Sequence, residues 1–335
     1  MASKARSFSL VPWVPSSQLL VSRGTFASLD PADLLDQQLG PITILFGHEH
    51  GKYPYGNSLI VTGTNETVMI DPCLGVVARK GVLPRVDRVI HSHTHEDHIA
   101  GTHLFRGVPW HAHTLDALGL ESIEGLMEIF GAPTGPEHDV FQAVMVNDFY
   151  YPEGGVVETF EEGDVFDLGG VNITVIHTPG HTHGHCCFLI EWGQVVEEKL
   201  VYLGDIELSG FGPYYGDAWS NLIDFEKSIE RLKTIDAHWW LTFHHKGLIE
   251  SRPLFLAMLE KFEWMIGDRE SRMLDFIKVP RTMNEIVEHR FVYRPGYTGY
   301  LVDSIERRSM GMHLDRLIES GRVSLSDGVY QANSL

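Results

Sequence analysis

The stretch VIHSHTHEDHIAG, residues 89–101, places four histidines and two carboxylates within eight positions. Neither solubility nor a hydrophobic core requires such a concentration of histidine. His93, His95, Asp97 and His98 have the spacing His-x-His-x-Asp-His. Residues two apart in an extended segment project to the same side, so the first two histidines can bind one ion. The last two residues follow a turn and can reach a second ion. Imidazole and carboxylate without thiolate favour zinc, iron or manganese over a closed structural zinc site.

Three later strand ends supply similar side chains. VNITVIHTPGHT (171–182) reads as a β-branched strand followed by a Pro-Gly turn that directs His181. KLVYLGD (199–205) ends in Asp205, and AHWWLTFHHKG (237–247) reads as a strand that ends in two histidines. Loops at strand ends are where α/β proteins mount catalytic groups. Two metals about 3.5–4 Å apart would need ligands of this number and mixture.

Together these motifs resemble the metallo-β-lactamase superfamily. The resemblance rests on His-x-His-x-Asp-His at 93–98, Thr-Pro-Gly-His-Thr at 178–182, Gly204-Asp205, a late histidine, and opening strands in NSLIVTGTNETVMIDP (57–72) that carry Asp71. It covers roughly residues 40 to 250 and is specific for the superfamily, but not for a substrate. It implies an α/β fold, an αβ/βα sandwich of two mixed sheets face to face, with helices outside and the metals at one edge.

The resemblance also implies roles for individual residues. It assigns a first divalent ion to His93, His95 and His181, a second to Asp97, His98 and the late histidine, and a bridge between them to Asp205. Zinc is the expected metal, with iron or manganese as alternatives. Aligning FHHK (243–246) with the family's Pro-Gly-His-Gly makes His245 the late ligand. His244 is the alternative, because the Pro-Gly pair is missing and the turn can differ.

Residues that contact substrate are less well specified. Tyr214 and Tyr215 follow Asp205 closely and could donate hydrogen bonds to a developing oxyanion, although aromatic packing explains them equally well. His183 extends the Pro-Gly-His turn and could face substrate, although an exposed loop position is the simpler interpretation. These three residues are therefore candidates for substrate binding only.

The 335 residues are expected to form three parts. These are an N-terminal arm (1–40), a catalytic domain (41–268) with an apolar insertion or lid (114–151), and a winged-helix-like C-terminal region (269–335). In the C-terminal region, PRTMNEIVEHRF (280–291) predicts a helix with a capping box formed by Thr282 and Glu285. Residues 307–332 predict a second helix and then a β-hairpin that turns at Asp327-Gly328.

Composition narrows the classes of partner. The net charge of −19 disfavours nucleic acid and anionic membranes. The C-terminal region is nearly neutral, so packing or homodimer contact is favoured over DNA binding. No apolar stretch is long enough to span a membrane. The three cysteines are too few for a disulfide framework, and prolines interrupt the apolar start of the chain, which argues against a signal peptide. A cytoplasmic protein with a small-molecule substrate is expected.

The expected reaction is metal-dependent hydrolysis. A hydroxide that bridges two divalent metals would attack an ester-like acyl bond (a thioester, lactone or lactam) of a small organic substrate. Asp97 or a metal-bound water could protonate the leaving group, and Asp205 would hold both ions. One alternative is a phosphodiesterase or ribonuclease-like enzyme, although no basic groove is evident in the sequence. Another is a mononuclear iron sulfur dioxygenase, which would keep the same His-x-His-x-Asp-His motif.

Overall fold

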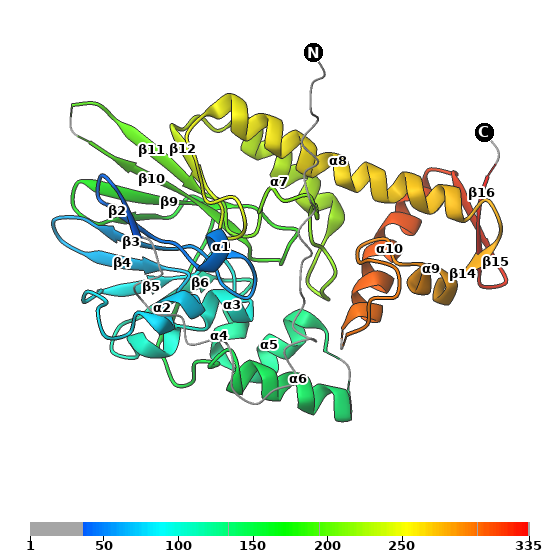
Figure 1. The fold of residues 1–335 in the computed structure, drawn as a ribbon, viewed down its shortest axis with the longest axis horizontal. Coiled ribbons are helices and arrows are strands. Elements are labelled where there is room, and N and C mark those ends of the chain that lie inside the picture. Colours follow the sequence, from blue (N-terminus) through cyan, green and yellow to red (C-terminus); the bar gives the residue numbers. More distant parts are fainter. Residues whose placement is uncertain (1–35, 133, 194, 300, 334–335) are drawn as a thin grey trace, which may run out of the picture.

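The computed structural model describes residues 36–132, 134–193, 195–299 and 301–333. Two mixed β-sheets face each other with helices on the outside (Figure 1), which confirms the predicted αβ/βα sandwich. The expected N-terminal arm lies outside the described residues except for its last five, which begin with strand β1.

The first sheet has seven strands in sequence order. They are β1 (Asp36–Leu39), β2 (Ile42–Leu45), β3 (Ser58–Thr62), β4 (Thr67–Ile70), β5 (Arg88–Ile90), β6 (Trp110–His113) and β7 (Val157–Phe160). β1 to β4 pair antiparallel, and β4 to β7 pair parallel. The two opening strands predicted in 57–72 are β3 and β4. Because β5 is parallel to its neighbours, the histidine motif that follows it emerges at one edge of the sheet.

The second sheet has six strands in the order β13-β12-β11-β10-β9-β8. Their bounds are β8 (Val165–Asp167), β9 (Val171–His177), β10 (Cys186–Trp192), β11 (Glu198–Tyr202), β12 (Trp239–Leu241) and β13 (Leu248–Ile249). β11 and β12 are parallel, and helix α7 (Leu222–Thr234) connects them. The C-terminal ends of these two strands therefore meet at the same edge, as βαβ crossovers require.

Alternation along the central strands builds two cores. On β11 and its continuation, Leu200 and Tyr202 pack into the core between the sheets, whereas Val201 and Leu203 pack into a core under α7 and α8 (Arg252–Phe276). Neighbouring strand residues point to opposite faces, so a strand buried on both faces must be apolar throughout. This two-sided packing fixes the strand ends that carry the candidate ligands.

The helices lie outside the sheets and around one edge. The shorter ones are α1 (His48–Gly51), α2 (Leu74–Ala78), α3 (Glu96–Ile99), a 3₁₀ turn (Thr102–Phe105) and α4 (Leu118–Glu121). The insertion 114–151 is largely helical, because α4 is followed by α5 (Ile123–Phe130) and α6 (Pro136–Asn147). Ser122 caps α5 by accepting from Gly125 N, and Gly131 ends it in the left-handed conformation.

The C-terminal region contains a small sheet and two helices. Its elements are β14 (Arg281–Thr282), α9 (Met283–His289), α10 (Val302–Glu319), β15 (Val323–Ser326) and β16 (Val329–Ala332), and the strand order is β14-β16-β15. The predicted capping box of Thr282 and Glu285 is present, and so is the hairpin turn at Asp327-Gly328. Helix α8 runs through the boundary expected at residue 268 and joins this region to the sandwich.

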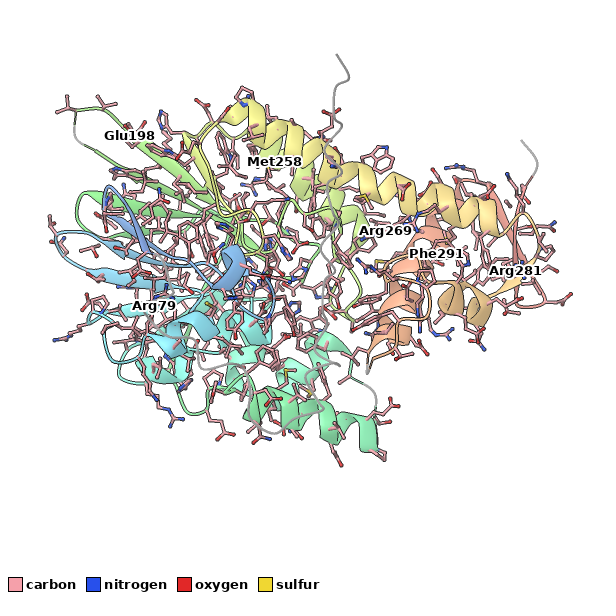
Figure 2. The ribbon with its side chains drawn as sticks, viewed as in Figure 1. Arg79, Glu198, Met258, Arg269, Arg281 and Phe291 are labelled. Carbon is pink, nitrogen blue, oxygen red and sulfur yellow. The ribbon has the colours of Figure 1, made fainter. Side chains whose placement is uncertain are left out.

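Side chains fill the junction between the sandwich and the C-terminal region. Arg269 of α8 and Phe291 lie where α8 meets α10 (Figure 2). Phe291 belongs to a core that includes Met273 of α8 and Leu314 of α10. Val302 and Ile305 of α10 belong to the core that includes the facing sheets, so the region is packed against the sandwich. No described helix combines the length and the apolar character that a bilayer crossing would need.

Candidate metal centre

The candidate ligands converge where four strand ends meet. The histidine motif follows β5, His181 follows β9, Asp205 follows β11 and His244 follows β12. His95 is the N-cap of α3, so that the next two ligands of the motif, Asp97 and His98, lie in the first turn of that helix. His91, in contrast, is buried and contacts His111 O and Thr102 Oγ1, away from this convergence.

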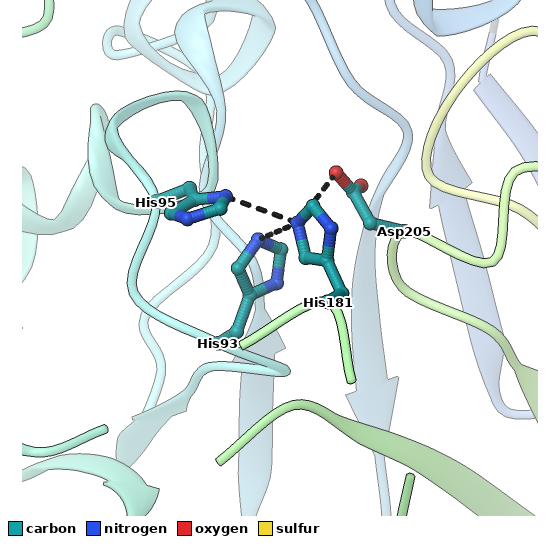
Figure 3. Close-up of side chains that lie close together, drawn as sticks. All are labelled: His93, His95, His181 and Asp205. Atoms are coloured by element: carbon teal, nitrogen blue, oxygen red, sulfur yellow. Dashed lines mark hydrogen bonds and ion pairs between the residues drawn. The ribbon is translucent and has the colours of Figure 1, made fainter. Parts of the chain in front are cut away.

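The first cluster consists of His93, His95, His181 and Asp205, whose ligand atoms all lie within 4.8 Å of one another. His181 Nε2 is 3.2 Å from His93 Nε2 and 3.0 Å from His95 Nδ1 (Figure 3). It is also 3.2 Å from Asp205 Oδ2. Three imidazoles and a carboxylate thus surround one point.

The second cluster consists of Asp97, His98 and His244, again with ligand atoms within 4.8 Å of one another. His244 Nε2 is 2.9 Å from Asp97 Oδ2. Asp205 also reaches this cluster, because its Oδ1 is 2.9 Å from His98 Nε2 and 3.7 Å from His244 Nε2. Asp205 therefore presents one oxygen to each cluster, which is the placement that a bridging carboxylate needs.

Fixed acceptors set the tautomers of three of these imidazoles. A carbonyl or carboxylate oxygen only accepts, so the ring nitrogen that faces it carries the hydrogen and the other nitrogen keeps its lone pair. The contacts are His98 Nδ1 to Asp71 Oδ2 (2.8 Å), His181 Nδ1 to Tyr214 O (3.1 Å) and His244 Nδ1 to Gly51 O (2.7 Å). Hydrogen bonds of this kind orient metal-binding histidines in proteins.

Asp71 is held firmly enough to orient His98. Its Oδ1 accepts from Ser92 N at 2.7 Å, and its Oδ2 accepts from Tyr202 OH at 2.9 Å. The residue has a φ of 46°, a left-handed conformation that costs energy for a side chain other than glycine. Phe243 stacks on the other side of His98, with ring centroids 3.6 Å apart. Hydrogen bonds hold the carboxylate of Asp71 in place, and Asp71 and Phe243 together fix the imidazole of His98.

The donor set fits divalent metal ions. Ring nitrogens of three imidazoles lie 3.0–3.2 Å apart, and such an arrangement needs a proton or a cation among them. Asp97 Oδ2 is buried and makes no hydrogen bond within the described part of the chain, although His244 Nε2 is close to it. Asp97 Oδ2 and His244 Nε2 would lie this close to each other if both bound the same metal ion. Zinc, iron and manganese all accept imidazole and carboxylate.

The electrostatics of the centre also call for positive charge. Burial lowers the pKa of His244, but Asp205 and Asp97 outweigh burial and raise the pKa to about 10. The pKa of His98 moves in the same direction, because neighbouring carboxylates outweigh burial there too. Desolvation raises the pKa of Asp205, yet His98 and His244 bring it well below its usual range. Asp205 thus stays ionised and attracts protons or metal cations.

The structure corrects the preference for His245 as the late ligand. His245 Nε2 lies 3.6 Å from Glu207 Oε2, outside the two clusters, whereas His244 is the histidine of this turn that joins the second cluster. After β12, Thr242 Oγ1 donates to His244 O and accepts from Gly247 N. This tight turn, with a φ of 64° at His245, replaces the missing Pro-Gly turn and shifts the ligand back by one residue.

The three candidates for substrate binding have different positions. Tyr215 is buried and its OH is 2.9 Å from His313 Nε2, so the expectation that it faces substrate is wrong. Tyr214 donates from its OH to Asp217 Oδ1 at 3.0 Å. His183 is exposed and stacks on Trp219, with ring centroids 5.1 Å apart.

Two residues that no motif indicated contact His95. Phe130 of α5, within the 114–151 insertion, stacks on the imidazole, with centroids 4.7 Å apart and ring planes at 15°. Asp217, in the loop before α7, places Oδ2 3.2 Å from His95 Nε2. Both are distant in sequence from the ligand motifs, and only the fold brings them to the centre.

This chain is similar to known proteins of one superfamily. A family profile described as Metallo-beta-lactamase superfamily matches residues 52–261. An uncharacterized protein of Aquifex aeolicus is 28% identical over 180 residues, which cover 51% of this chain and 74% of that protein. An acyl-coenzyme A thioesterase of Gallus gallus is 28% identical over 197 residues, which cover 52% of this chain and 66% of the thioesterase, just under two thirds of its length.

A solved structure is similar over nearly the whole chain. It is a metallo-beta-lactamase family protein of Thermus thermophilus, with a TM-score of 0.62 and 19% sequence identity. The superposition covers 90% of this chain and 98% of that one. At this identity the similarity establishes the fold alone.

Proposed function

The chain belongs to the metallo-β-lactamase superfamily, and from this premise we propose that it is a metal-dependent hydrolase of thioesters. The observation that carries the proposal is the pair of ligand clusters that share Asp205, with a different oxygen facing each. The similarity to an acyl-coenzyme A thioesterase supports a thioester among the ester-like bonds that such a centre can hydrolyse.

Two divalent ions would be held by this chain's own residues. The first would bind His93, His95 and His181, the second Asp97, His98 and His244, and both would bind Asp205. Bound there, such ions acidify water and polarise a carbonyl oxygen. We propose both the number of ions, two, and their kind, which is zinc, iron or manganese.

The chain's own groups orient the reaction and handle a proton. In thioester hydrolysis a water oxygen bonds to the acyl carbon and gives up a proton, the C–S bond breaks, and the departing thiolate accepts a proton. Asp97 is a buried carboxylate of the second cluster, and we assign it the transfer of that proton to the thiolate. Asp71 and the backbone acceptors of the imidazoles keep the ligands in place.

Aromatic side chains border the centre on the lid side. Phe130 stacks on His95, and Phe141 of α6 meets Phe130 edge to face at 5.3 Å. Tyr53 lies 6.2 Å from the ring of His244 and 6.3 Å from that of Phe149. Such a wall favours an apolar acyl group and excludes water around it. The net charge of −19 disfavours a long polyanion such as RNA, in which many phosphates extend along the protein surface.

A substrate panel tests the proposed function. We expect the metal-loaded protein to hydrolyse an acyl-coenzyme A thioester with a kcat/KM at least about tenfold above that for a lactone, a β-lactam or bis(4-nitrophenyl) phosphate, a difference of about 1.4 kcal/mol in transition-state binding. Treatment with a chelator should abolish hydrolysis, and zinc, manganese or iron should restore it. Faster cleavage of the phosphodiester, or thioester hydrolysis that survives complete removal of metal, would refute the proposal.

A further inference from the structure

The loop between β11 and α7 supports the first cluster from behind. Within it, Tyr214 O accepts from His181 Nδ1 at 3.1 Å, and Asp217 Oδ2 lies 3.2 Å from His95 Nε2. Ser220 Oγ donates to His181 O at 2.7 Å. The loop therefore contacts two of the three imidazoles of the cluster on the side away from their convergence.

We propose that Asp217 is a positioning residue that fixes the orientation and the tautomer of His95 and thereby sets the affinity of the first metal site. His95 faces the cluster with Nδ1, at 3.0 Å from His181 Nε2. A carboxylate beside Nε2 favours the tautomer with hydrogen on that nitrogen, which leaves the Nδ1 lone pair for a metal. The inference rests on the metal-dependent centre of the proposed function.

His95 and Asp217 are paired in a buried environment. His95 Nε2 and Asp217 Oδ2 are both buried, and neither makes a hydrogen bond elsewhere within the described residues. Asp217 Oδ1 is held by Tyr214 OH at 3.0 Å, so the carboxylate cannot rotate freely. Phe130 stacks on the imidazole face at 15°. The ring of His95 is thus clamped between an aromatic face and a carboxylate edge.

Helix α10 of the C-terminal region holds the backbone of the two residues that precede Asp217. Arg308 donates to Gly216 O at 3.4 Å and to Phe130 O at 2.7 Å, so that it joins the loop to helix α5. Ser309 Oγ donates to Tyr215 O at 3.3 Å. Packing here is tight, because a Cβ on Gly216 would lie 2.3 Å from the side chain of Ile305.

Helix α8 fixes the start of the same loop. The buried guanidinium of Arg269 donates to Pro213 O at 2.5 Å and to Phe211 O at 2.6 Å. Its Cζ also lies 5.3 Å from the ring centroid of Tyr215. Through these contacts the C-terminal helices take part in the support of the first cluster, which gives the region a role in the centre without any contact with the ligands.

Zinc affinity tests the proposal directly. Metal-free wild-type, Asp217→Ala and Asp217→Asn proteins are titrated with zinc against a chromophoric chelator that resolves two sites. We expect Asp217→Ala to weaken one site by roughly 10–100-fold, the range for loss of a carboxylate behind a metal-binding histidine, and to leave the other unchanged. Asp217→Asn keeps one carbonyl oxygen and should fall between. In a His244→Ala background, adding Asp217→Ala should weaken the remaining first site by the same factor.

Glu226→Gln is the matched control. Glu226 accepts from Arg316 of α10 at 2.8 and 2.9 Å, so the change removes a carboxylate from the same junction without touching a candidate ligand. Both zinc affinities should remain at wild-type values in this variant. The thermal midpoint of each metal-free protein is measured alongside.

Two outcomes would overturn the proposal. Unchanged affinities in Asp217→Ala would show that His95 needs no carboxylate behind it. A parallel loss at both sites, with a lowered thermal midpoint of the metal-free protein, would show a general structural role. If Asp217→Ala does not fold, Asp217→Asn decides by the same criteria. The readout is metal binding, so a failure to hydrolyse thioesters would refute the proposed function and leave this result standing.

Discussion

Asp205→Asn should lose metal from both sites and reduce kcat/KM for the thioester by at least roughly a thousandfold, about 4 kcal/mol. The carboxylate presents Oδ2 to His181 at 3.2 Å and Oδ1 to His98 at 2.9 Å, so each cluster uses one of its oxygens. The amide of asparagine carries no charge and has one oxygen, so it can serve at most one cluster, and only weakly. Metal content is measured by elemental analysis, and turnover on the same sample.

Asp236→Asn provides the comparison for the loss of a carboxylate. The side chain of Asp236 is 95% exposed, and this variant should keep both metals and wild-type turnover. An Asp205→Asn protein that binds two metals normally and turns over at the wild-type rate would remove the bridging role from Asp205.

His244→Ala should lose the second ion and reduce turnover by roughly two to three orders of magnitude, about 3–4 kcal/mol. Its Nε2 lies 2.9 Å from Asp97 Oδ2, and its Nδ1 donates to Gly51 O at 2.7 Å, so the alanine removes an oriented member of the second cluster. His245→Ala is the adjacent control. That side chain contacts Glu207 outside the clusters, so the variant should keep both ions. The reverse pattern of metal loss would return the ligand role to His245.

The resemblance to the metallo-β-lactamase superfamily predicted the sandwich and most of the candidate centre, and local sequence signals predicted several of the strands. The apolar β-branched runs that become β3, β4 and β9 are each bounded by turn residues. A short run of this kind predicts a buried strand from only a few neighbouring residues. The histidine motif was informative because its spacing matches an extended segment followed by a helical turn, as observed in α3. The capping box at Thr282 and the turn at Asp327-Gly328 are equally local.

Other features depended on contacts distant in sequence. The choice between His244 and His245 follows from a turn that the Thr242 hydroxyl organises, which no spacing rule describes. Tyr215 is turned away from the centre because His313 of α10 pairs with its hydroxyl from 98 residues away. Asp217 has no motif around it. The expected boundary at residue 268 falls inside α8, because the helix continues across the junction between the two parts.

The most direct test of the account is a crystal structure of the metal-loaded protein with anomalous scattering recorded at the absorption edge of the bound metal. The account predicts two anomalous peaks about 3.5–4 Å apart, as in binuclear hydrolases. One should contact His93, His95 and His181, the other should contact Asp97, His98 and His244, and Asp205 should contact both. A single peak, or a second peak bound by His245 in place of His244, would contradict it.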